Sequence, residues 1–455
     1  MKNTKNIISM IAAISIAMCA VSCGDGSAAS SGRSAGTAGG SAKASAGATE
    51  AEKADKTTDA GDAEATMEAE DGVYEGETGE LADGDVLTGE MTAGDAEDVK
   101  KSAVEGEGDA QTNSAMPEAG QLTAGEWRDN DNWGFLMNLV NSGTISFPSY
   151  GIDPRGRVAV TVKNESGEAA ANVAVNLLGE DNELLWSAVT DKNGRAYLFT
   201  PEGKTAAGVE ATNSEGKTQS AEVKANSSGG EQGGSEVSDY ADCELTLGGN
   251  ELYKKTEIMF IVDTTGSMSD EMLFLQSEFS AIAKEVGTED TYYSANFYRD
   301  EGDDYVTKLN DFTNDVATVQ SQINAESADG GGDIPEAVGR IMNETLSNGK
   351  WSDDSVKIAF MIFDAPPHEE DSDEVAQAVK DAAKKGIRLV PIVSSNTERD
   401  TELFARGAAI CTGGSYVFLT DDSGIGDSHL EPIIGDYKVE KLHDIIVRII
   451  GDYRQ

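Results

Sequence analysis

The chain has 455 residues, with 82 acidic residues against 35 basic ones and a formal net charge of -47 at pH 7. A surface with this charge repels phosphate backbones, which excludes nucleic-acid binding, and it attracts divalent cations to any cluster of carboxylates. The length allows about three domains of ordinary size.

The first 23 residues have the pattern of a secretion signal. Lys2 and Lys5 precede an apolar run, Ile7 to Val21, which is shorter than a comfortable membrane-spanning helix. The run ends at Ala20-Val21-Ser22-Cys23, which resembles a bacterial lipobox. This resemblance implies that Cys23 is lipidated and anchors the chain to a membrane, and ordinary cleavage with free secretion is the alternative. Either reading places the mature chain outside the cytoplasm.

Two cysteines, Cys243 and Cys411, follow the signal region. Disulfides persist outside the cytoplasm, so a Cys243–Cys411 bridge and two buried free thiols are both open interpretations. The three histidines are scattered and there is no Cys-x-x-Cys sequence, which argues against a zinc site.

Residues 24–119 change from a Ser/Ala/Gly tract to an Ala/Glu/Asp/Gly-rich stretch with almost no aromatic residues. Such a composition buries too little apolar surface to offset chain entropy, so it predicts a disordered acidic tether. An acidic interaction tail is the alternative. Residues 120–153 form a lead-in segment in which aromatic residues return, and a short helix is expected at Trp133–Val140.

Residues 154–225 predict a small β-sandwich. Four alternating runs are separated by turn sequences such as Asn193-Gly194. The order of strands and turns resembles the carboxypeptidase-regulatory or prealbumin-like modules of surface proteins, which implies a stalk. The four runs of the predicted sandwich are Val158–Val162, Val173–Leu177, Leu184–Val189 and Ala196–Phe199.

Residues 226–244, rich in Gly and Ser, are expected to be a flexible linker.

Residues 245–455 alternate between short apolar runs and amphipathic segments, which predicts a doubly wound α/β domain with a largely parallel sheet. Ile258–Val262 is continuously apolar, as a strand buried on both faces would be. Ser269–Val286 has an apolar stripe at helical spacing. Further strands are expected at Tyr292–Tyr298, Tyr305–Leu309, Val356–Phe363, Ile387–Val393 and Tyr416–Thr420, and further helices at 314–325, 334–347, 374–385, 398–410 and 439–453.

Oxygen-bearing side chains follow the first of these strands. Asp263, Thr265 and Ser267 stand at positions i, i+2 and i+4, and a tight turn at Gly266 leads into the helix. A hard divalent cation prefers oxygen ligands, and this spacing directs three of them toward one point. An apolar strand followed by Asp-x-Thr-Gly-Ser-Met resembles the metal-ion-dependent adhesion site of von Willebrand factor A domains. A plain helix-capping turn is the alternative.

Two more segments carry this resemblance. The loop Asp329–Glu336 lacks the threonine that the family usually supplies there, but its Gly-Gly-Gly-Asp-x-Pro-Glu sequence resembles the A domains of hemicentin and of the alpha-kinase-associated group. That likeness implies Asp333 as a ligand, direct or through water; a Gly-rich loop that starts a helix is the alternative. Asp364, after the strand Val356–Phe363, matches the third-loop aspartate. Asp300 is expected either to support the site or to form a surface salt bridge.

The resemblance implies a cell-surface, non-enzymatic domain that holds Mg²⁺ or Ca²⁺ and binds an acidic group of a protein or matrix partner. His368 and Glu369 are expected on the rim of the site. One alternative is a structural envelope lipoprotein whose metal only stabilises the loops. The other is a haloacid-dehalogenase-type phosphohydrolase, which would need an aspartate where Thr265 stands.

Overall fold

The computed structural model describes residues 122–225, 240–248, 250, 252–332, 334–425 and 428–454. Several predicted features lie outside the described residues: the signal segment 1–23 with Cys23, the tether 24–119, residues 226–239 of the linker, and Asp333. The described residues form an α/β part and a β-sandwich part, which belong to one compact unit.

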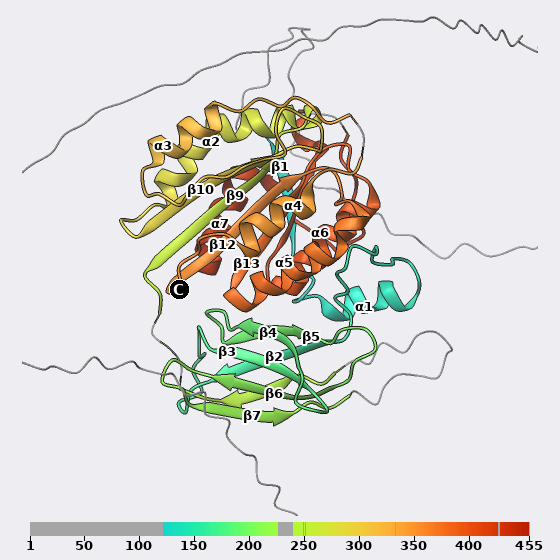
Figure 1. Ribbon diagram of the computed structural model, residues 1–455, viewed down its shortest axis with the longest axis vertical. Helices are drawn as coiled ribbons and strands as arrows, with labels where there is room; N and C mark the ends of the chain where they lie inside the picture. Colours follow the sequence, from blue (N-terminus) through green and yellow to red (C-terminus); the bar gives the residue numbers. More distant parts are fainter. Residues whose placement is uncertain are drawn as a thin grey trace, which may run out of the picture. The chain divides into compact units, whose positions relative to one another are not determined.

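The α/β part is built on a mostly parallel sheet (Figure 1). Strands β9 (Lys255–Asp263) and β12 (Ser355–Phe363) are buried along almost their whole length, as strands covered on both faces should be. The other strands of this sheet are β10 (Thr291–Tyr298), β11 (Thr307–Lys308), β13 (Ile387–Val393), β14 (Tyr416–Thr420), β1 (Thr123–Trp127) and β15 (Glu440–Lys441). Within the described residues the strand order is β11-β10-β9-β12-β13-β14-β1-β15, and the five strands from β10 to β14 in this order are parallel.

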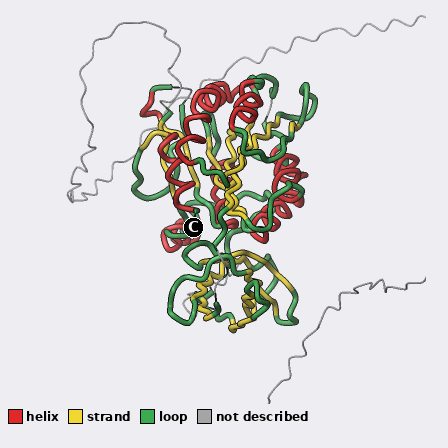
Figure 2. Tube along the Cα trace, turned by 90° about the vertical axis from the view of Figure 1, so that its left-hand side faces the viewer, coloured by secondary structure: helices red, strands yellow, loops and turns green. Residues whose placement is uncertain are grey.

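Helices cover both faces of this sheet, and Figure 2 shows the strands as a layer between them. Alternate residues of β9 face opposite sides: Ile258 and Phe260 pack with the first group of helices, and Met259 and Ile261 with the second. The doubly wound, largely parallel fold predicted from the sequence is confirmed. The first group is α2 (Ser269–Val286), α3 (Val316–Asn324) and α7 (Leu442–Tyr453), and the second is α4 (Val338–Met342), α5 (Ser372–Lys385) and α6 (Arg399–Thr412).

Several short helical turns connect these elements. A π-helical turn, Asn343–Ser347, continues α4, and 3-10 turns occupy Gly266–Met268, Glu369–Asp371 and Asp421–Ser423. In the described part of the chain, no helix has the length and apolar character needed to cross a membrane.

The lead-in segment contributes a strand that the sequence did not predict. β1 lies between β14 and β15, antiparallel to both, with Thr123 opposite Thr420 and Lys441. In Figure 1 it is the cyan strand among strands coloured yellow to red. Helix α1 (Trp133–Asn141) follows it. The α/β part therefore begins before the sandwich, and the predicted boundary at residue 245 is wrong in this respect.

The sandwich has two sheets with strand orders β5-β2-β8 and β4-β3-β6-β7 among the described residues. Burial alternates along β2, as expected for strands with one face on a core. Trp186 and Phe199, from opposite sheets, make an edge-to-face contact with ring centroids 5.3 Å apart. The strands are β2 (Arg157–Lys163), β3 (Ala174–Gly179), β4 (Leu184–Val189), β5 (Arg195–Phe199), β6 (Ala206–Thr212), β7 (Thr218–Glu222) and β8 (Cys243–Thr246).

The last sandwich strand corrects a second boundary. β8 pairs in parallel with β2, Val160 opposite Cys243, so residues 243 and 244 are not linker but sandwich. Only four residues form this strand, and they follow a Gly- and Ser-rich stretch, so the sequence carried little signal for it.

Cys243 and Cys411 are buried free thiols, so the second of the two open interpretations is confirmed and the Cys243–Cys411 bridge is wrong. Cys243 belongs to the sandwich, whereas Cys411 lies in α6 of the α/β part.

Candidate metal centre

The first loop of the site runs from the end of β9 into α2. Asp263, the last residue of β9, is fully buried, and its Oδ1 accepts hydrogen bonds from the Thr265 backbone N–H at 2.9 Å and from the Thr265 hydroxyl at 2.7 Å. Thr265 Oγ1 lies 3.5 Å from Ser267 Oγ. The structure thus brings together the carboxylate and the two hydroxyls singled out at positions i, i+2 and i+4.

Asp364 joins this cluster from the neighbouring strand. β12 runs parallel to β9 with Ile362 beside Val262, so both strands end at the same edge of the sheet. A hydrogen bond with Ser267 lowers the pKa of Asp364, but burial outweighs it and the net shift is upward. Burial, with the charge of Asp364 as the next cause, raises the pKa of Asp263 to about 7.

The glycine loop closes over the first loop. Gly266 N–H donates to Gly330 O at 3.1 Å, and Asp329 N–H donates to Thr264 O at 3.0 Å. Gly330 has φ +80°, and a Cβ there would lie 2.5 Å from Asp303 Oδ1, so both backbone conformation and space require glycine. Asp333, predicted as a ligand in this loop, lies outside the described residues.

Glu336 is a residue of the site that sequence reasoning treated only as part of a motif. It is 4% exposed, and its backbone N–H donates to Pro366 O at 3.2 Å, which ties the glycine loop to the loop after Asp364. Burial raises the pKa of Glu336 to about 9, with smaller contributions from Asp263 and other nearby acids. An acidic residue beside a proline usually begins an exposed helix turn, so nothing local indicated that it is buried.

These loops enclose a cavity of about 350 Å³. It is lined by Thr265, Gly266, Ser267, Gly330, Gly331, Gly332, Ile334, Glu336, Asp364, Ala365 and Asn396. In the described part of the chain, no three Asp, Glu, His or Cys side chains converge closely enough to hold a metal alone. A cation here would therefore need the hydroxyls of Thr265 and Ser267 beside the carboxylates.

Buried carboxylate oxygens without partners test whether a cation fits. Among the described atoms, Asp263 Oδ2, Glu336 Oε2 and both oxygens of Glu271 are buried without a hydrogen bond of standard geometry. The Tyr298 hydroxyl lies close enough to lower the pKa of Asp263, yet no such hydrogen bond joins the two. Burying several carboxylates without compensation is costly, and a bound divalent cation is the usual remedy. The donor set fits Mg²⁺ or Ca²⁺, which prefer oxygen ligands.

The predicted rim residues lie beside this centre. His368 Nε2 lies 2.9 Å from Asp300 Oδ1, and the Asp300 backbone N–H donates to Asp303 Oδ2 at 3.2 Å. Asp303 in turn accepts from Gly331 N–H at 2.9 Å. Asp300 therefore both pairs with His368 and supports the glycine loop through Asp303. Glu369 is exposed at the start of a 3-10 turn.

Three side chains in the loops after β13 and β14, those of Ser395, His429 and Asp421, form a hydrogen-bonded series. His429 Nε2 is 3.2 Å from Ser395 Oγ, and its Nδ1 is 2.8 Å from Asp421 Oδ1. In hydrolytic triads the carboxylate is buried and the nucleophile is open to substrate. Here the exposure is the opposite of that in a triad: the Asp421 side chain is 70% exposed and Ser395 is 6% exposed. The hydrogen-bonded series instead holds the loop after β14 against the end of β13.

A comparison with protein families agrees with the fold of the α/β part. Residues 257–423 match the family model described as the von Willebrand factor A domain. No curated protein matches the chain. Similar solved structures include the conserved hypothetical protein BatB from Bacteroides thetaiotaomicron, with 16% sequence identity, a TM-score of 0.33, and coverage of 44% of this chain and 98% of that chain. Domains of the matched family generally mediate protein–protein interactions. The C-terminal part of this chain contains a von Willebrand factor A domain.

Proposed function

We propose that this protein is a cell-surface binding protein whose von Willebrand factor A domain uses a divalent cation to hold an acidic group of a macromolecular partner. Asp263, Thr265, Ser267 and Asp364 would hold Mg²⁺ or Ca²⁺, with Glu336 beside them. The bound cation would supply a local positive charge on a strongly acidic surface, which is what an acidic partner requires.

The observation that carries this proposal is the unpartnered Oδ2 of Asp263, a fully buried carboxylate whose other oxygen accepts from the Thr265 hydroxyl. A buried carboxylate that only stabilised the fold would be expected to have its hydrogen bonds satisfied within the protein. Thr265 and Ser267 also lie on the wall of an open cavity, where a partner's oxygen has access to the same point.

Calorimetric titration of the full-length chain with Mg²⁺ and with Ca²⁺ tests the metal site. We expect one site, and Asp263→Asn should weaken it at least tenfold, or about 1.4 kcal/mol. Asp311→Asn is the matched control, because Asp311 is exposed and pairs with Lys350 away from the site. Equal binding by wild type and Asp263→Asn would contradict the assignment.

Binding of the chain to immobilised extracellular matrix proteins, with and without EDTA, tests the ligand role. Chelator and Asp263→Asn should abolish binding together, and Asp311→Asn should not change it. Metal binding without any chelator-sensitive partner would favour the alternative of a structural lipoprotein whose metal stabilises the loops. Turnover of p-nitrophenyl phosphate that Asp263→Asn abolishes would instead favour the phosphohydrolase.

The surface location rests on the sequence of residues 1–23. Lipidation of Cys23 would anchor the chain, and replacing it in Cys23→Ser should release the protein into the medium. Continued fractionation of this variant with membranes would require a different anchor.

A further inference from the structure

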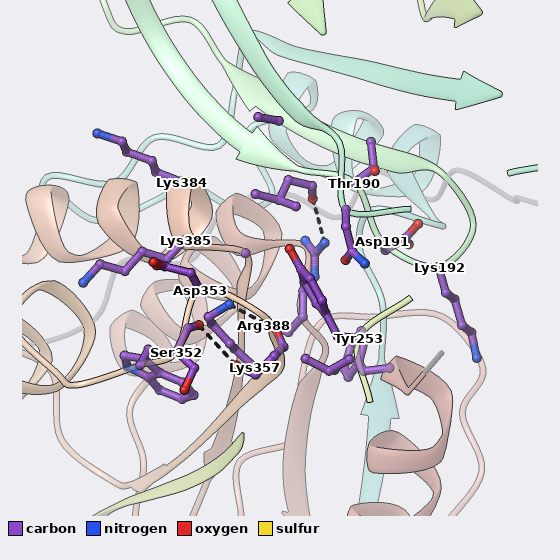
Figure 3. A pocket seen from close by; sticks show the side chains of 18 of the residues that line it. Thr190, Asp191, Lys192, Tyr253, Ser352, Asp353, Lys357, Lys384, Lys385 and Arg388 are labelled. Carbon is purple, nitrogen blue, oxygen red and sulfur yellow. Dashed lines mark hydrogen bonds between the residues drawn. The ribbon is translucent and has the colours of Figure 1, made fainter. Parts of the chain in front are cut away.

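A second cavity, of about 430 Å³, lies at the edge of the sheet opposite the candidate metal centre. Figure 3 shows the side chains that line it. Residues at the starts of β12 and β13, including Lys357 and Arg388, form one wall, whereas Asp263 and Asp364 of the metal centre lie at the opposite ends of strands. Thr190, Asp191 and Lys192 of the sandwich form another wall. Both parts of the described unit therefore contribute to this cavity.

The side chains that line this cavity carry a net positive charge, whereas the chain as a whole is strongly negative. Six basic side chains against three acidic ones give a local charge of +3, in a chain whose net charge is -47. The basic residues are Arg128, Lys192, Lys357, Lys384, Lys385 and Arg388, and the acidic ones are Asp191, Asp353 and Asp452.

Three of these basic side chains donate hydrogen bonds to backbone carbonyls and not to carboxylates. Lys357 Nζ donates to Ser355 O at 3.0 Å, and Lys385 Nζ donates to Leu346 O at 2.8 Å. Arg388 donates to Thr412 O at 3.0 Å and, across to the sandwich, to Val189 O at 2.8 Å. Among the described residues, none of the three forms a salt bridge with a carboxylate, although acids outnumber bases in the chain.

Two of these three side chains are also buried. Lys357 is 6% exposed and Arg388 is 8% exposed. Burial lowers the pKa of Lys357 and of Lys385, and more distant acids such as Glu257 and Asp353 oppose this shift at Lys357. Arg128 contributes less to the cavity, because it pairs with Glu126 and Asp452.

We propose that this cavity binds a small molecule that carries a phosphate group. Lys357 and Arg388 would neutralise the phosphate charge inside the cavity, and Lys385 would add positive charge at its margin. Lys192 and Lys384, which are exposed, would guide the ligand to the opening. Tyr253 and Trp351 provide an aromatic wall for the remainder of the ligand. A volume of this size is within the usual range for small-molecule sites, roughly 300–1,000 Å³.

The test is calorimetric titration of the full-length chain with inorganic phosphate and with glycerol 3-phosphate, in EDTA so that no cation at the metal centre contributes. Both should bind, and Lys385→Gln and Lys357→Gln should each weaken binding at least fivefold. Lys284→Gln is the matched control, since Lys284 is an exposed residue of α2 that does not line the cavity. Asp263→Asn should bind phosphate like the wild type, which separates this proposal from the metal site.

The proposal would be overturned if no binding were seen at 20 mM phosphate, because a specific site should have a dissociation constant of roughly millimolar or below. Equal binding by the wild type and the lysine variants would overturn it as well. Tighter binding of acetate than of phosphate would overturn the choice of ligand class. Phosphatidylglycerol vesicles distinguish the phosphate of a lipid headgroup from that of a soluble molecule. If the protein binds these vesicles, loses this binding in Lys385→Gln, and binds neither soluble phosphate, the small-molecule assignment is overturned. If a lysine variant unfolds at a lower temperature than wild type, Lys384→Gln, at the exposed opening, replaces it.

Discussion

Asp263, Thr265, Ser267 and Asp364 were predictable as a cluster because their signals are local. They lie at or just after the ends of two buried strands, and parallel neighbouring strands end at the same edge of a sheet. Glu336 was not predictable as part of the cluster in this way. Its burial depends on the contact between its backbone and Pro366, on a loop that the sequence places 30 residues away.

His368 predicts a pH dependence of stability. Burial disfavours the charged imidazole, but the hydrogen bond and charge of Asp300 outweigh burial and raise the pKa of His368 above 6.5. The pair therefore contributes stability that is present below pH 6.5 and is lost as pH rises through the higher folded-state pKa. Because the pair is partly exposed, its contribution should be under about 1 kcal/mol.

Urea unfolding of wild type and His368→Gln at pH 6 and pH 9 measures this contribution. The stability difference between the two proteins should shrink at pH 9. A difference that stays the same at both pH values would show that charge on His368 is not involved.

The free thiols lead to a prediction about chemical labelling. Burial raises the pKa of both Cys243 and Cys411, which lowers their reactivity in the folded protein. Denaturation without reductant should expose both to Ellman's reagent, and both should react slowly beforehand. If neither thiol reacts after denaturation, the two cysteines are bonded.

At the scale of elements, hydrophobic periodicity predicted the strands and helices that follow one another along the α/β part. It did not predict the positions of β1 and β8, because their partners are distant in sequence. The hydrogen bond from the Thr123 hydroxyl to Thr420 O, for example, spans 297 positions. A five-residue strand with one glycine has no periodicity strong enough to indicate such a partner.

β1 also predicts the effect of a single substitution. A Cβ at Gly125 would lie 2.4 Å from the ring of Phe418 in the neighbouring β14, so a side chain there would push the two strands apart. Gly125→Val should destabilise the protein by about 1–3 kcal/mol, as overpacking does. The control is Gly134→Ala in α1, where a Cβ meets no atom within 4 Å. Thermal unfolding followed by circular dichroism compares the two, and equal midpoints would mean that β1 is not packed as described.

The segment after β1 is fixed by buried charges. Arg406 of α6 is fully buried and contacts Asp129 at 2.8 Å and Glu402 at 3.1 Å. Removing one partner of such a group leaves an uncompensated buried charge, which typically costs about 3–5 kcal/mol. This network and β1 together attach the lead-in segment to the α/β part.

At the scale of the whole molecule, the order of segments in the sequence predicted a stalk-like sandwich between the tether and the binding domain. The fold has a different connectivity, because β1 joins the α/β sheet before the sandwich begins and β9 continues it afterwards. The sandwich is thus an insertion in the α/β part, and Arg388 links the two through Val189.

This connectivity determines how the molecule would carry mechanical force. Tension between a point upstream of residue 122 and a partner at the metal centre passes through β1 and its hydrogen bonds to β14 and β15, and the sandwich lies outside the load path. In an optical trap, with handles at the N-terminus and at a cysteine introduced by Ser269→Cys, β1 should detach before any extension from sandwich unfolding appears. Sandwich unfolding as the first event would mean that force reaches it directly. A surface protein built in this way would bear the first pull on its ligand with one short strand. Only after release of that strand would the sandwich, which lies between β1 and β9 in the sequence, come under load.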